Sequence, residues 1–99
     1  MKVFVLGPED TVLGFSLVGV EGETVGDPTA AASRLEEMRR AGEVGLVLIT
    51  ANLARGMGRR LDEFRASHSL PIVLEVAGPG EVVERPSARE LLRRAVGAA

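Results

Sequence analysis

The chain has 99 residues, 45% of them hydrophobic and 26% charged, a size and composition that fit one compact domain and exclude a second full domain. A formal net charge of −2 and the absence of Trp and Tyr exclude a strongly basic nucleic-acid-binding domain and an aromatic base-stacking surface. The absence of cysteine excludes disulfides and cysteine-based metal sites, and no apolar run approaches roughly 18 residues, so we expect a cytoplasmic protein without a membrane span or signal peptide.

The first predicted elements are a strand and a helix. Residues 2–7, KVFVLG, form an apolar run that ends in a Gly-Pro pair, as a buried strand should. Glu9 and Asp10 follow, and negative charge is favourable beside the free N–H groups of a first helical turn. We expect this helix to end near Leu17.

The second predicted helix carries signals at both ends. It follows a weaker strand candidate at residues 20–25, VEGETV. Asp27 is placed as the N-cap and Pro28 as the first helical residue, and Gly42 lies where a left-handed C-terminal cap is expected. The inward face is predicted to hold Ala31, Leu35 and Met38.

The third strand is the most apolar segment of the chain. Residues 44–50, VGLVLIT, read as a central parallel strand covered on both faces. The apolar residues that follow recur at helical spacing, and they are Leu53, Met57, Leu61 and Phe64. They predict one continuous third helix, although Gly56 and Gly58 weaken its middle.

The end of the chain is predicted to hold a fourth strand, a linker and a last helix. The strand, within LPIVLEVAG, begins at Pro71 or Ile72. We expect a sandwich domain over residues 1–78, a linker over 79–86 and a C-terminal helix over 87–99. The apolar stripe of this helix consists of Ala88, Leu91, Leu92, Ala95 and Val96. Because a helix of about three turns is unstable alone, it must pack on the domain's own sheet or on another chain.

The order of these elements predicts the fold class. Strands and helices alternate along the chain, which implies right-handed crossovers between parallel strands. We therefore expect an α/β fold, with a small parallel four-stranded sheet and helices on both faces. This is a Rossmann-like or receiver-like sandwich, to which the C-terminal helix is added.

The turn GPED after the first strand occupies the position at which α/β folds often bind phosphate groups. It lacks both the GxGxxG and the GxxxxGK[ST] spacing, and its two acids would repel a phosphate. A phosphoaccepting receiver domain needs an Asp at the end of the third strand and a Lys after a fifth strand. Here Thr50 ends the third strand and the one lysine is Lys2. A receiver-like interaction module without a phosphoacceptor remains an alternative function.

Other candidate catalytic groups do not converge. His68 is one histidine without a second imidazole or a cysteine, so it indicates neither a metal site nor a triad. Adjacent acids at 36–37 and 62–63 lie on predicted helices, where consecutive side chains point about 100° apart. We therefore expect no catalytic residue, no cofactor and no metal, and an interaction protein is the default.

Four stretches resemble the F subunit of V-type and A-type rotary ATPases. They are GFSLVGVEG at 14–22, the third and fourth strands, and RELLRRAVG at 89–97. The resemblance covers nearly the whole chain. It implies a non-catalytic subunit of the central stalk, which couples ATP turnover in a catalytic hexamer to proton or sodium movement through a membrane ring.

The same resemblance implies partners and contact residues. The partners would be the coiled-coil D subunit and the A and B subunits of the hexamer, so that the chain reaches the membrane only through the complex. The partner-binding candidates lie on the C-terminal helix and are Arg89, Leu91, Leu92, Arg93 and Val96.

Two glycines of the resembling segment have an expected packing role. Gly14 and Gly19 lack side chains, so we expect Val12, Phe15 and the neighbouring leucines to pack closely against the sheet. Apolar side chains of this segment that are not buried in the core would form a docking surface.

Overall fold

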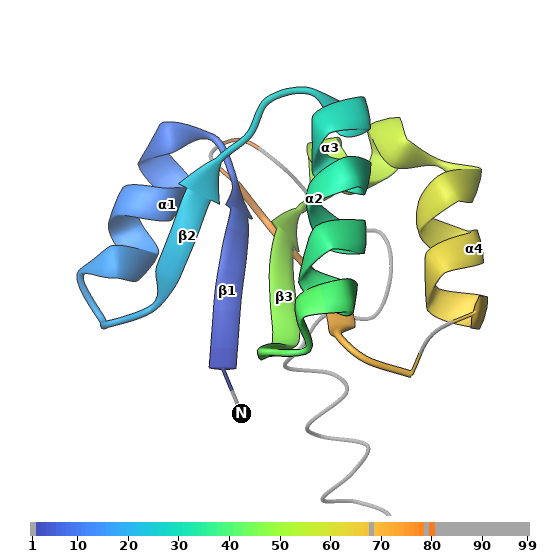
Figure 1. Cartoon of the computed structure of the whole chain (residues 1–99). Helices are drawn as coiled ribbons and strands as arrows, with labels where there is room; N and C mark the ends of the chain where they lie inside the picture. Colours follow the sequence, from blue (N-terminus) through green and yellow to red (C-terminus); the bar gives the residue numbers. More distant parts are fainter. Residues whose placement is uncertain (1, 68, 79, 81–99) are drawn as a thin grey trace, which may run out of the picture.

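A computed structural model of the chain describes residues 2–67, 69–78 and 80. The elements in chain order are β1 (Lys2–Gly7), α1 (Glu9–Ser16), β2 (Glu21–Thr24), α2 (Pro28–Ala41), β3 (Val44–Thr50), α3 (Ala51–Met57), α4 (Arg59–Ser67) and β4 (Ile72–Val76). Figure 1 shows them arranged around one sheet, with α1 at one end of the molecule and α4 at the other. The predicted strands are all confirmed, with small differences at their ends.

The sheet has four parallel strands in the order β2-β1-β3-β4. The chain moves one way from β1 to β2 and the opposite way from β2 to β3 and on to β4. Because strand crossovers are right-handed, the reversal places α1 on one face and α2, α3 and α4 on the other. The predicted α/β class with helices on both faces is confirmed.

Neighbouring residues of β1 show the two faces directly. Val5 and Leu6 are both fully buried, and successive side chains of a strand point to opposite sides. A Cβ atom on Gly22 would lie 2.3 Å from a methyl carbon of Val5 and 3.2 Å from one of Val12, so Val5 faces α1. Leu6 instead belongs to the core under α2, α3 and α4.

The main core lies between the sheet and α2, α3 and α4. Its buried members are Leu6, Val25, Ala31, Leu35, Met38, Val44, Val47, Ile49, Leu53, Ala54, Met57, Leu61 and Val73. Phe4, Ala32 and Phe64 pack at its margin. The inward face predicted for α2 is therefore confirmed.

Both predicted ends of α2 are also confirmed. The Asp27 carboxylate accepts a hydrogen bond from the N–H of Thr29 at 3.3 Å, and Pro28 begins the helix. Gly42 has φ 74°, and its N–H donates to the carbonyl of Met38. Local sequence signals decide these ends because each needs only a few neighbouring residues.

The prediction of one continuous third helix is wrong. Gly58 has φ 56° and ψ −128°, which separates α3 from α4. Leu53, Met57 and Leu61 are nevertheless all buried, so the residues of the predicted apolar face still lie in the core. The glycine conformation lets the chain turn between two short helices that both reach the core.

Several predictions lie outside the described residues. They concern most of the linker at 79–86, the C-terminal helix at 87–99 and His68.

Candidate functional site

The carboxyl edge of the sheet is the usual ligand site of an open α/β fold. At this edge β1 and β3 come close together, since a Cβ atom on Gly7 would lie 2.8 Å from Thr50 Cγ2. Thr50 is 1% exposed and stands at the end of β3, as predicted. This position holds no carboxylate that could accept a phosphoryl group.

A small hollow of about 260 Å³ opens at the same edge. Its lining consists of Pro8, Val25, Gly26, Pro28, Thr50, Asn52 and Leu53. None of these residues carries a charge, so the hollow offers no cation for a phosphate and no acid–base pair for catalysis.

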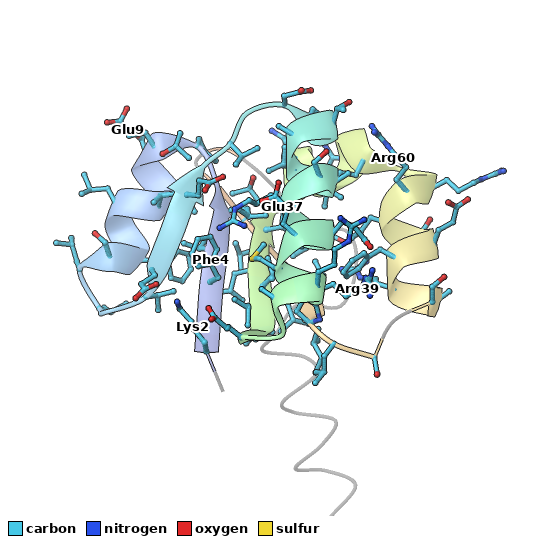
Figure 2. The ribbon with its side chains drawn as sticks, viewed as in Figure 1. Lys2, Phe4, Glu9, Glu37, Arg39 and Arg60 are labelled. Carbon is cyan, nitrogen blue, oxygen red and sulfur yellow. The ribbon has the colours of Figure 1, made fainter. Side chains whose placement is uncertain are left out.

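The acids of the first turn also lie apart from any catalytic arrangement. Glu9 and Asp10 are exposed in the first turn of α1, and Figure 2 shows Glu9 at the end of the molecule, directed away from the ribbon. Among the described residues no group of three or more His, Cys, Asp or Glu side chains could hold a metal ion. The two acids lie in the first turn of the helix, as predicted, where negative charge is favourable.

The charged pairs on α2 are structural. Glu36 accepts a hydrogen bond from Arg39 Nε at 2.9 Å and lies 3.8 Å from Arg40 Nε. The hydrogen bonds to Glu36 raise the pKa of the Arg39 guanidinium above its ordinary value, against a smaller effect of burial. Both arginines therefore pair with Glu36 on their own helix.

Two arginines join helices to strands. Arg34 of α2 pairs with Glu23 of β2 at 3.2 Å, and its guanidinium lies 5.6 Å from the centre of the Phe4 ring. On α4, Arg65 donates to the carbonyl of Val73 at 2.8 Å and lies 3.6 Å from the buried Glu75 carboxylate. Arg34 and Arg65 therefore both have partners within the chain, and these contacts connect helices to the sheet.

The expected packing of Gly14 and Gly19 is wrong. Among the described residues, no atom of another segment would lie within 4 Å of a Cβ atom on either glycine. Gly19 instead has φ 88°, and its N–H donates to the Ser16 carbonyl while the N–H of Val20 donates to that of Phe15. This is the Schellman motif, which uses a left-handed glycine to close a helix.

The leucines beside Phe15 are likewise not packed on the sheet. Leu13 is 61% exposed, Leu17 81% and Val18 76%. A signal for this was present in the sequence, because Leu13 and Leu17 are four residues apart and share a side of the helix. It was ambiguous, since Val12 and Phe15 mark a second apolar side.

The α1 face of the sheet is only partly covered by the described residues. Over β3 and β4, Leu46, Leu48, Leu74 and Val76 are half-buried and Ile72 is 47% exposed. Between α1 and the segment after β4 lies a hollow of about 490 Å³, lined by Asp10, Thr11, Gly14, Phe15, Val18, Ala77 and Gly78. This hollow is lined mainly by apolar groups, with Asp10 and Thr11 as its polar side chains.

Comparison with known proteins decides the family. Residues 3–94 match the family described as the ATP synthase (F/14-kDa) subunit. The chain belongs to this family. It is 34% identical to the F subunit of the A-type ATP synthase of Pyrococcus furiosus and 37% identical to that of Thermococcus kodakarensis, in each case over 98% of this chain and 95% of the relative. The F subunit of the V-type ATP synthase of Thermus thermophilus is 29% identical, over 94% of this chain and 93% of the relative.

The F-subunit resemblance seen in the sequence is therefore confirmed, and the chain is a subunit of an A-type or V-type ATP synthase. No helix within the described ranges has the length and apolar character needed to cross a bilayer. The five partner-binding candidates between residues 89 and 96 lie beyond the part of the chain that the structure describes, so their role stays a prediction.

Proposed function

We propose that this chain is a non-catalytic rotor subunit in the central stalk of an ion-translocating A-type or V-type ATPase. In this function it docks on the coiled-coil D subunit and helps to couple ATP turnover in the hexamer of A and B subunits to proton or sodium transport. It works in the cytoplasm, peripheral to the membrane as part of the soluble ATPase sector.

The observation that carries this proposal is family membership over residues 3–94. The carboxyl edge of the sheet supports it. There a threonine and an uncharged hollow stand where an α/β enzyme or a receiver would place its reactive groups. Family membership also favours the stalk over the receiver-like alternative.

Co-expression with the coiled-coil subunit tests the proposal. We expect the two chains to co-purify and to elute together in size-exclusion chromatography. Alone, the chain should neither hydrolyse ATP nor gain thermal stability when nucleotide is added, since a ligand that binds the native state raises apparent stability. Turnover of ATP by the chain alone, or failure to bind the coiled coil, would contradict the proposal.

The C-terminal segment is proposed as one contact, through Arg89, Leu91, Leu92, Arg93 and Val96. Leu91→Asp or Leu92→Asp should weaken the complex more than it lowers the melting temperature of the free chain, because a carboxylate would enter an apolar interface. Equal affinity of the wild type and both variants would show that this segment is not the contact.

A further inference from the structure

The outer side of α1 carries an unusual concentration of exposed apolar side chains. Among the described residues the exposed large hydrophobics are Leu13, Leu17, Val18, Leu70 and Ile72. The first three lie on α1 and the turn that closes it, and we name them the α1 ridge. α1 itself contains no buried residue, whereas α2 contains three.

The two leucines of the ridge point away from the sheet, whereas Val18 also lines the hollow between α1 and the segment after β4. Val12 lies on the inner side, beside Gly22 of β2, while Leu13 and Leu17 are 61% and 81% exposed. Residues four apart share one side of a helix, so these two leucines form a single outward row.

The ridge is also held in a defined geometry. Leu17 has helical φ and ψ of −66° and −22°, and its N–H donates to the Leu13 carbonyl. The two hydrogen bonds of the Schellman motif then close the turn through Val18 and Gly19. A docking partner would therefore find these side chains on an ordered helix end, which reduces the entropy lost on binding.

The two charged residues of α1, Glu9 and Asp10, are both acidic. No Lys or Arg occurs between residues 3 and 33. Glu21 and Glu23 are paired with Lys2 and Arg34, at 3.0 and 3.2 Å. Glu9 and Asp10, by contrast, make no ion pair among the described residues, and they lie one turn before Leu13. A complementary partner would thus combine apolar side chains with Lys or Arg placed to face this acidic end.

We propose that the α1 ridge is a docking surface for a helix of the coiled-coil subunit, whose apolar stripe covers Leu13, Leu17 and Val18 and whose Lys or Arg side chains face Glu9 and Asp10. This inference rests on the proposed function and adds a contact separate from the C-terminal segment. A helix fits because a row of side chains at i,i+4 spacing packs into the groove of another helix. A second copy of this chain fits less well, because it would bring two acidic surfaces together.

Cysteine labelling tests whether the ridge is free and then covered. Because the chain has no cysteine, Leu17→Cys introduces a unique thiol, and Ala66→Cys on the exposed side of α4 is the matched control at the other end of the molecule. In the free full-length chain both thiols should react with a maleimide at similar rates. In the complex with the coiled-coil subunit, labelling at position 17 should slow by about tenfold or more, with little change at position 66.

Three labelling results would overturn the inference. Protection of position 17 in the free chain at every concentration would mean that the chain covers its own ridge. Protection that grows with concentration would identify a second copy as the occupant. Equal labelling of position 17 in the free chain and in the complex would show that the ridge is not a contact, while leaving the proposed function intact.

Affinity measurements complete the test. The double variant Leu13→Asp and Leu17→Asp should bind the coiled-coil subunit at least about tenfold more weakly than the wild type. Leu70→Asp, at a residue that is 54% exposed away from the ridge, should change affinity by less than about twofold. Melting temperatures close to the wild type would confirm that the double variant folds.

The contribution of Glu9 and Asp10 to binding can be measured separately. Glu9→Gln with Asp10→Asn should reduce the dependence of the affinity on salt concentration, because the paired charges are lost. If the double leucine variant binds with unchanged affinity, the inference that the ridge is a contact is wrong, and the proposed function stands. If the wild-type chain fails to bind the coiled coil, both the proposed function and this inference are wrong.

Discussion

The two faces of the sheet are built in different ways. On one face α2, α3 and α4 bury a continuous aliphatic core that includes Leu35, Ile49 and Leu61, each at most 2% exposed. On the other face α1 contains no buried residue and shows Leu13 and Leu17 to solvent. The contrast indicates that the first face supplies most of the stability, while the second leaves apolar side chains of α1 exposed.

The largest effect is expected from truncating a side chain in the main core. Leu35→Ala should lower the free energy of unfolding by about 2–5 kcal/mol, because it removes buried methyl groups and leaves a cavity. Leu17→Ala is the matched control on the other face and should change it by less than about 0.5 kcal/mol, since Leu17 is 81% exposed. Chemical denaturation of the free chain measures both. Similar losses in the two variants would contradict the contrast between the faces.

An intermediate effect is expected where β2 meets β1. A Cβ atom on Gly22 would lie 2.7 Å from the Val5 carbonyl oxygen and 2.3 Å from a Val5 methyl carbon. Gly22→Ala should therefore destabilise the fold by about 1–3 kcal/mol, because backbone cannot yield as a flexible side chain does. Thermal unfolding measures the loss, and a melting temperature equal to that of the wild type would show that β2 shifts freely.

The smallest effect is expected on α1, with the opposite sign. Gly14 lies within the helix, and no other segment in the described part of the chain would contact an added methyl group. Gly14→Ala should therefore raise the free energy of unfolding by about 0.5–1 kcal/mol, the difference in helix propensity between the two residues. The same denaturation experiment applies. A loss of stability would mean that the surface around Gly14 is more crowded than the described residues indicate.

These glycines show where prediction from the sequence failed. Gly14 and Gly19 were expected to allow close packing, yet close approach occurs at Gly22 and at Gly56, where a Cβ atom would lie 2.5 Å from Pro28 Cγ. A sequence does not reveal this difference, because each close contact joins segments that are distant along the chain. The left-handed conformation of Gly58, which divides α3 from α4, was missed for a related reason: helical spacing of apolar residues continues across it.

The candidate site was predicted in part. The absence of a phosphoacceptor at Thr50 could be read from residue types alone, and the structure places Thr50 at the expected strand end. The exposure of Leu13 and Leu17 could not be predicted from the sequence, since α1 has apolar residues on more than one side. Only the position of Gly22 and Val5 beneath Val12 shows which side faces the sheet.

By itself, the sequence determined the order and type of the elements, the ends of α2 and the membership of the F-subunit family, because capping, periodicity and motif resemblance depend on residues close together in the chain. The tertiary structure alone decided which glycines lie close to distant segments, where the third helix breaks and which apolar side of α1 stays exposed. Each of these depends on the packing of distant segments, in which the same apolar residue can serve as core or as contact surface.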